Sequence, residues 1–261
     1  MLARTTRTVR VTDAGEHCLQ DFRRILAEVL EADESDSGMH SSPRGRLTIT
    51  APVLFGGMYV TPIVTEYLSR YPEVSASFLF LDCVVNLLDE GADVSVCIGE
   101  LPDSTMQAIL VGQVRRVICA SPGYLAKHGI PTSPDDLHAH TVVPASRVTH
   151  NPEWELMDKG EVLSIRLQAR MITTTNDSAV AAAVGGFGVP RLLSYQVGEH
   201  LIAGRIKTVL PDFEPAALPV HVVQLGGHQA PRRVRAFLDL AIERLRQDAT
   251  LNWPQIRPSP G

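Results

Sequence analysis

From residue 47 onward, short apolar segments typical of β-strands alternate with amphipathic segments typical of α-helices. Residues 47–50 form the first predicted strand, and residues 74–80 alternate apolar and small residues as the second. Gly56 and Gly57 open the predicted helix between them, which Pro72 ends. A short helix at 84–90 and a strand at 94–98 follow. Strands that alternate with helices at this spacing indicate βαβ units and a parallel sheet, so we expect an α/β fold.

A second α/β series begins with a predicted strand at 117–120. Ser121 with Pro122 begins a short helix, and Ser133 offers an N-cap before Pro134. Three strand candidates follow, at 141–143, 162–167 and 171–173. Asn176 or Asp177 then caps a small-residue helix at 178–184, which Gly185 and Gly186 end, and a late strand lies at 220–224. The last helix, from Arg232, carries an apolar stripe of period 3.6, so the two series predict two similar lobes.

The first 45 residues follow a different pattern. Residues 1–11 are rich in β-branched side chains and predict an extended segment, after which Thr12 or Asp13 offers a helix N-cap. Apolar residues then recur at spacings of three, four and three, at Leu19, Phe22, Leu26 and Val29. Such a seam is found on helices that lie on their own core and on helices that form dimers. We favour a dimer because residues 35–45 (SDSGMHSSPRG) are turn formers that set the helix apart.

The charge distribution and the spacing of the cysteines indicate where in the cell the protein is expected to act. The formal net charge is −5, yet the first ten residues carry Arg4, Arg7 and Arg10 and no acid. No apolar segment is long enough to cross a membrane, and no export signal follows the basic start. Four cysteines lie far apart without a CxxC pair, at Cys18, Cys83, Cys97 and Cys119. We therefore expect reduced cysteines and a cytoplasmic protein without a membrane partner.

The sequence contains no complete motif for catalysis or cofactor binding. The glycines at 185–188 do not complete G-x-G-x-x-G, because Arg191 stands where the third glycine belongs. No P-loop, nucleophile elbow or H-E-x-x-H motif is present. His138 and His140 have no third ligand nearby in the sequence, and Cys83 with Cys97 fits small core residues better than a redox pair. We expect no enzyme activity, no cofactor and no metal.

Seven segments together resemble the LysR-type transcriptional regulators, in that family's order and spacing from residue 4 to about residue 247. They are Arg4–Glu16, Gly45–Pro52, Arg70–Val74, Leu88–Asp93, Ile98–Leu101, Cys119–Leu125 and Val234–Phe237. The first resembles the wing of the family's winged helix-turn-helix where it enters the linker helix. Family members carry further residues before this wing, so the resemblance implies that the chain lacks the recognition helix, through a misassigned start or a truncation. Cys97 stands where related members often have an arginine.

The resemblance implies a type 2 periplasmic-binding-protein-like effector domain of two lobes, preceded by a wing remnant and a linker helix. The implied boundaries are wing 1–12, linker helix 13–34, hinge loop 35–45, lobe I 46–116 plus 220–247, lobe II 117–219 and tail 248–261. Arg4, Arg7 and Arg10 in the wing would contact DNA phosphates, which position a protein without specifying a sequence.

A ligand would bind between the lobes, because open parallel sheets bind ligands beyond the carboxyl ends of their strands. The candidate effector-binding residues follow predicted strands or begin a helix: Pro52, Val53, Phe55, Asp82, Cys83, Ile98, Gly99, Ser146, Asn176 and Asp177. Phe55 and Asn176 are expected on opposite walls of the cleft. Free backbone N–H groups at Gly56 and Asn176 favour a carboxylate, so we expect an organic acid as effector.

The expected function is therefore metabolite sensing and oligomerisation in a transcriptional regulator. The expected partners are a small-molecule effector and further copies of the chain as a homodimer or homotetramer. Operator DNA is expected as a partner only of a full-length form. Two alternatives remain: a solute-binding protein of the same two-lobe fold, and a truncated dominant-negative partner of a full-length regulator.

Overall fold

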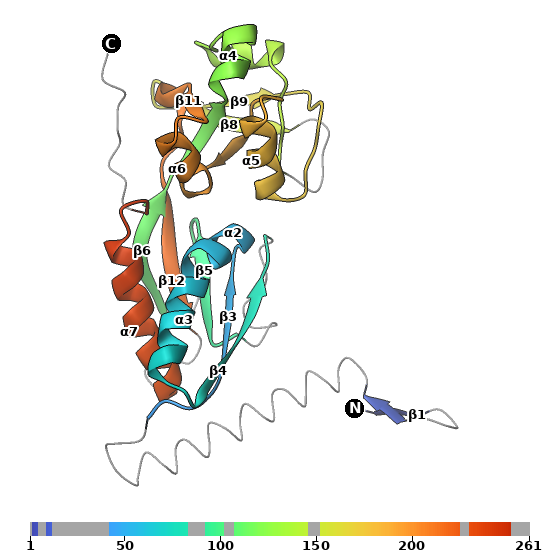
Figure 1. Cartoon of the computed structure of the whole chain (residues 1–261). Helices are drawn as coiled ribbons and strands as arrows, with labels where there is room; N and C mark the ends of the chain where they lie inside the picture. The colour runs from blue at the N-terminus through green and yellow to red at the C-terminus, as the bar shows by residue number, and fades with distance from the viewer. Residues whose placement is uncertain are drawn as a thin grey trace.

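The computed structural model describes residues 2–4, 9–11, 42–82, 92–101, 107–145, 152–224 and 230–251. Most of these residues form two α/β lobes, which lie one above the other in the view of Figure 1. Near the N-terminus, β1 (Leu2–Arg4) pairs antiparallel with β2 (Val9–Val11), within the segment predicted to be extended. Arg7, the predicted linker helix and its seam of Leu19, Phe22, Leu26 and Val29 lie outside the described residues.

Lobe I contains a five-stranded sheet with the order β4-β3-β5-β12-β6. Its strands are β3 (Gly45–Ala51), β4 (Val74–Phe80), β5 (Val94–Ile98), β6 (Gln107–Val114) and β12 (Leu218–Gln224). β3 runs parallel to β4 and β5, as predicted, whereas β12 runs antiparallel to β5 and β6. The sequence predicted each strand except β6. The carboxyl ends of the three parallel strands therefore share one edge of the sheet.

Two helical segments pack on one face of this sheet (Figure 1). The first comprises α2 (Val53–Phe55), a π-helical stretch (Gly56–Val60) and α3 (Thr61–Arg70); the second is α7 (Arg232–Gln247). The first helix thus begins at Val53 and not at Gly56, which is a correction to the sequence prediction. Gly56 lies inside the helix, where a Cβ atom would come within 2.6 Å of the Phe80 ring. Glycine therefore allows the helix to approach β4 closely.

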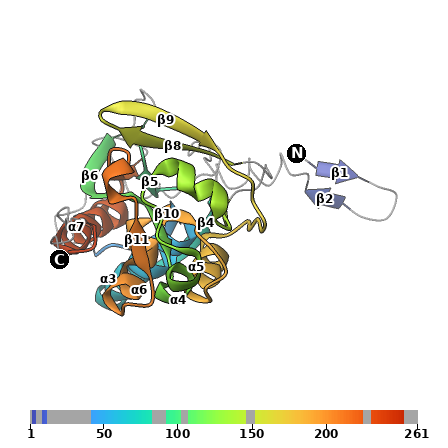
Figure 2. The same cartoon turned by 90° about the horizontal axis from the view of Figure 1, so that it is seen from above.

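Lobe II is built on a three-stranded sheet with the order β10-β7-β11. Its strands are β7 (Arg116–Ala120), β10 (Arg191–Leu193) and β11 (Lys207–Val209), and both outer strands run antiparallel to β7. The sequence predicted β7 but not β10 or β11, so this antiparallel sheet is a correction to the parallel sheet expected for the series. The strand candidates at 141–143 and 171–173 form only isolated parallel bridges, of Val142 with Ala169 and Val189 and of Ala145 with Thr173. The candidate at 162–167 corresponds to β9 (Glu161–Arg166), which forms a hairpin with β8 (Glu153–Asp158) (Figure 2).

The helices of lobe II are short. They are α4 (Pro122–His128), α5 (Asn176–Val184), α6 (Ser194–Ile202) and two 3₁₀ turns (Pro134–Ala139 and Pro211–Phe213). Ser121 caps α4 as predicted, because its Oγ accepts from the Tyr124 N–H at 3.3 Å. Thr175 is the N-cap of α5, so the helix begins one or two residues earlier than predicted, and it ends at Gly185 as expected. The first residue of α5, Asn176, faces lobe I, where it contacts Asp82.

Candidate functional site

Pro52 and Asp82 follow neighbouring strands at the edge of the lobe I sheet that faces lobe II (Figure 1). β3 and β4 pair in register up to Ala51 and Phe80, and the Leu81 N–H donates to the Ala51 carbonyl oxygen at 3.0 Å. This pairing places the start of α2 beside Asp82. The rule that ligands bind beyond the carboxyl ends of parallel strands directs attention to this edge.

The Asp82 carboxylate connects the two lobes. Its Oδ1 accepts the Val53 backbone N–H at 2.9 Å, and its Oδ2 accepts the Asn176 side-chain amide at 3.4 Å. Asn176 is the first residue of α5 in lobe II and is half-buried, whereas Asp82 is exposed. The structure therefore brings together three of the predicted site residues. We call Val53, Asp82 and Asn176 the lobe seam.

An aromatic cluster lies behind the seam and also joins the lobes. Tyr195 from α6 packs edge-on against Phe55 and Tyr59, with ring centroids 5.4 and 5.9 Å apart. Tyr195 is 2% exposed and belongs to the core of lobe I although it lies on a lobe II helix. Burial raises the pKa of Tyr195, and the Asp82 carboxylate raises it further. The Tyr195 hydroxyl is therefore neutral at physiological pH, and the cluster provides an apolar packing layer behind the seam.

The position of Phe55 corrects the predicted site. Its side chain is fully buried against Tyr59 and Tyr195, so it does not line a wall opposite Asn176. The reason is the earlier helix start, which turns the third helical residue into the core. Val53 is 43% exposed and Met58 is 38% exposed, so these side chains offer the accessible apolar surface on this helix.

The backbone N–H of Gly56 is also not free for a ligand. It donates to the Pro52 carbonyl oxygen at 2.7 Å, which closes the first helical turn. The expectation of a carboxylate-binding N–H group at Gly56 is therefore wrong.

The end of β5 contributes a neutral, largely internal surface. Cys97 is half-buried, its Sγ lies 3.5 Å from the Ser95 Oγ, and burial raises the pKa of its thiol. Gly99 has φ +111°, and its N–H donates to the Pro219 carbonyl oxygen at 2.9 Å. Ile98 packs at the margin of the lobe I core. None of the three supplies a charge to the seam.

The other predicted site residues are less informative. Asp177 is exposed, and a hydrogen bond from Thr175 lowers the pKa of its carboxyl. Cys83 and Ser146 lie outside the described residues. In the segment predicted to be a wing, Arg4 of β1 lies opposite Val9 of β2, and Arg10 of β2 lies opposite Ala3 of β1.

The segments that join the lobes carry an ion pair that the sequence did not reveal. Arg115 lies between β6 and β7, and its Nη1 donates to the Glu214 Oε2 at 2.7 Å on the return segment before β12. Backbone and side-chain hydrogen bonds also tie Arg115 to Ser194 at the start of α6. The buried Arg115 Nε and Glu214 Oε1 have no hydrogen-bond partner in the described structure. A separation of 99 residues leaves no local sequence signal for such a pair.

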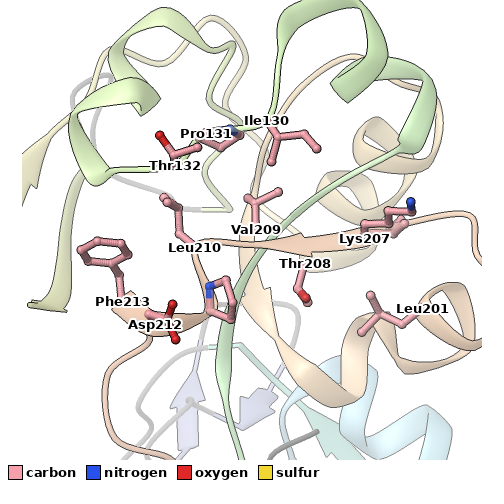
Figure 3. A pocket seen from close by; sticks show the side chains of 12 residues that line it. Ile130, Pro131, Thr132, Leu201, Lys207, Thr208, Val209, Leu210, Asp212 and Phe213 are labelled. Atoms are coloured by element: carbon pink, nitrogen blue, oxygen red, sulfur yellow. The ribbon is translucent and has the colours of Figure 1, made fainter. Parts of the chain in front are cut away.

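Two cavities lie elsewhere in the molecule. The larger, of about 600 Å³, lies beside β11 on lobe II and is lined by residues such as Ile130, Leu201, Lys207 and Phe213 (Figure 3). The smaller, of about 390 Å³, lies beside β6 and α7 and includes Glu100 and Arg246. Neither is lined by a seam residue.

Metal and membrane sites are not apparent in the described part of the chain. No three His, Cys, Asp or Glu side chains there are grouped as metal ligands. None of the described helices is both long and apolar enough to cross a bilayer. His140, one of two histidines considered as ligands, lies with its Nδ1 3.2 Å from the Tyr124 hydroxyl.

Comparison with known proteins identifies the fold and the family. A family model described as the LysR substrate binding domain matches residues 40–246. The chain belongs to the LysR family. An HTH-type transcriptional regulator of Xanthomonas campestris is 30% identical over 257 residues, which cover 95% of this chain and 74% of the relative. An uncharacterized HTH-type transcriptional regulator of Haemophilus influenzae is 28% identical over 234 residues, covering 90% of this chain and 81% of the relative.

A solved structure gives the same result. CrgA, a LysR-type transcriptional regulator from Neisseria meningitidis, matches with a TM-score of 0.71 and 25% identity, covering 94% of this chain and 83% of that chain. The two lobes of this LysR-family protein are therefore the effector-binding domain of a transcriptional regulator, with a periplasmic-binding-protein-like fold.

Proposed function

We propose that this LysR-family protein senses a small metabolite that binds at the lobe seam and thereby controls transcription. The observation that carries the proposal is the Asp82 carboxylate, which contacts Val53 of lobe I and Asn176 of lobe II at once. A ligand at this position would contact both lobes. It would therefore bind one arrangement of the lobes better than another, which is what a ligand-driven switch requires.

The residues around the seam suit a small ligand. Val53 and Met58 provide exposed apolar surface, and Asp82 and Asn176 provide polar groups that fix orientation. Binding sites for small molecules commonly combine such apolar walls with a few convergent polar groups. Pro52, Ile98, Gly99 and Asp177 remain candidates for the margin of this site.

The proposal extends to the assembly and its partners. We infer a homodimer or homotetramer that acts in the cytoplasm, with operator DNA as the partner of the regulator. We propose no catalytic role. A solute-binding protein of the same fold is the competing reading, and the regulators among the relatives favour transcription control.

A thermal-shift screen tests the proposed site. A metabolite that binds the folded protein raises its melting temperature with ligand concentration. We expect hits from a library of small metabolites to stabilise the parent protein, and Asn176→Ala to abolish most of that shift. Asp135→Ala is the matched control, because this exposed carboxylate lies on the Pro134–Ala139 turn of lobe II and not on α5. A hit that stabilises Asn176→Ala as strongly as the parent would overturn the site assignment.

A further inference from the structure

The hydrogen-bond donors at the seam are already used by a carboxylate of the protein itself. The Val53 N–H and the Asn176 amide are the groups that a ligand carboxylate would need there, and both donate to Asp82. A side chain tethered within the same molecule has a high effective concentration beside these donors. A free carboxylate would have to displace Asp82 and then remain near its negative charge.

Carboxylates also act on the aromatic cluster behind the seam. Burial is the largest cause of the raised pKa values of Tyr195 and Tyr59. The Asp82 carboxylate also raises the pKa of Tyr195, and the Asp248 and Glu199 carboxylates also raise that of Tyr59. Cys97 at the neighbouring strand end is a half-buried thiol whose pKa burial raises, so it carries no charge at neutral pH. The Asp82 carboxylate at the seam therefore opposes an added anion and attracts a cation.

Asp82 still has unused capacity as an acceptor. An ionised carboxylate offers roughly four lone-pair positions, and the contacts with Val53 and Asn176 use one on each oxygen. The side chain is exposed, so the remaining positions are accessible to a ligand from solvent. A protonated nitrogen can donate to them without displacing either existing partner.

We propose that Asp82 is a specificity-determining residue, which excludes simple carboxylates from the seam and selects an effector that carries a protonated nitrogen. This inference rests on the proposed function and replaces the organic acid expected from the sequence. It assigns Asn176 a role in holding Asp82 rather than in binding an anion directly.

A pair of probe ions of matched size tests the inference on the full chain. Melting temperatures are measured in propylammonium chloride and in sodium propionate, each against sodium chloride at equal ionic strength. In the parent we expect a saturable rise of roughly 1–2 °C with propylammonium and none with propionate. In Asp82→Ala the order reverses, because propionate can now accept from Val53 and Asn176.

Asp82→Asn is the second variant in case the alanine variant does not fold. Its amide oxygen can still accept from Val53, but the charge is gone, so the preference for propylammonium should disappear without a gain for propionate. Asp135→Ala, which removes an exposed carboxylate on the Pro134–Ala139 turn, should keep the parental order. A parent that responds equally to both ions, or to propionate more strongly, would overturn the proposal, as would an unchanged order in both Asp82 variants. The ion comparison reads the charge at Asp82 even if the metabolite screen finds no effector, so the two failures are distinguishable.

Discussion

Among the described residues, lobe I has one continuous core, whereas lobe II divides its apolar side chains between two smaller cores on opposite faces of β7. Val117 and Cys119 pack in one core of lobe II, and Ile118 and Ala120 pack in the other. The sheets differ accordingly, because β10 and β11 have only three residues each while β3 and β4 have seven. Lobe II therefore depends more on close backbone approach and local hydrogen bonds.

Two glycines illustrate this difference in packing between the lobes. At Gly56 in lobe I the obstacle to a Cβ atom is the Phe80 ring, which is part of a side chain. At Gly188 in lobe II the obstacle is the Thr141 carbonyl oxygen, which a Cβ atom would approach to 2.2 Å. The Val189 N–H donates a hydrogen bond to this same Thr141 carbonyl oxygen, at 2.8 Å. A ring can rotate away, but a paired backbone segment cannot.

The largest expected effect is therefore that of Gly188→Ala. We expect it to lower the free energy of unfolding by about 3 kcal/mol, through overpacking and the loss of a buried backbone hydrogen bond. Gly56→Ala should cost about 1–2 kcal/mol, since the Phe80 ring can move. Urea unfolding monitored by circular dichroism measures both values. Gly57→Ala is the control, because nothing lies within 4 Å of its Cβ position. Equal costs at Gly188 and Gly56 would contradict the contrast between the lobes.

The second prediction concerns the ion pair that joins the lobes. Arg115→Met leaves the Glu214 carboxylate without its cation, and the side chains are 23% and 9% exposed respectively. Losing one partner of such a pair should destabilise the protein by about 2 kcal/mol, less than for a fully buried pair because Arg115 retains some solvent contact. We expect faster amide hydrogen exchange in β7, with β3 less affected.

The pH dependence of this variant has a defined sign. Burial raises the pKa of Glu214, and the Arg115 cation opposes that rise. A carboxyl whose pKa is raised on folding stabilises the protein below its unfolded pKa and loses this contribution as the pH rises through the folded pKa. Without Arg115 the loss should grow between about pH 4 and pH 7. Arg115→Met combined with Glu214→Met should recover most of the stability; a double variant no more stable than the single one would contradict this account.

The comparison of the lobes also shows how far the sequence predicts the fold. β3, β4, β5 and α7 are long enough to display a full apolar period, so their positions follow from the sequence. β10 and β11 span less than two periods, and their pairing with β7 depends on residues some 70 to 90 positions away in the chain. β6 was missed although it lies in the better-predicted lobe, where Gly112 interrupts its apolar run. Short elements are determined by their tertiary partners, which no local pattern displays.

The same limit applies to the candidate site. The order of strands and helices was sufficient to place Val53, Asp82 and Asn176 at facing ends of elements, and the structure brings them within hydrogen-bond distance. Phe55 was misplaced because the start of its helix was predicted three residues too late, and that shift changes which side chain faces the core. Tyr195 was missed because its partners lie on the other lobe.

The smallest expected effects concern two half-buried carboxylates. Asp136 in lobe II accepts hydrogen bonds from the Thr132 N–H, the Thr132 hydroxyl and the Ser133 N–H, at 2.8, 3.0 and 2.9 Å. Backbone hydrogen bonds from Thr132 and Ser133 lower the pKa of Asp136 to about 2. Glu66 in lobe I accepts two hydrogen bonds from the Arg244 guanidinium, which lowers its pKa. One carboxylate thus binds mainly backbone donors, and the other binds the side chains of Arg244 and Arg70.

This difference leads to opposite expectations in salt and in acid. Asp136→Asn should destabilise the protein at neutral pH, and high salt should change that cost little, because Asp136 holds neighbouring backbone N–H groups in place. The cost of Glu66→Gln should fall in high salt, since an ion pair that solvent reaches is screened. A carboxyl with a lowered pKa stabilises the fold above its unfolded pKa and loses that contribution as the pH falls through the folded pKa, so the gap between the parent and Asp136→Asn should close from about pH 4 down to about pH 2. Thermal melts at three salt concentrations and across this pH range measure both differences. If high salt removed the cost of Asp136→Asn as completely as that of Glu66→Gln, the two carboxylates would be equivalent surface charges, and lobe II would not depend on the backbone cap at its Pro134–Ala139 turn.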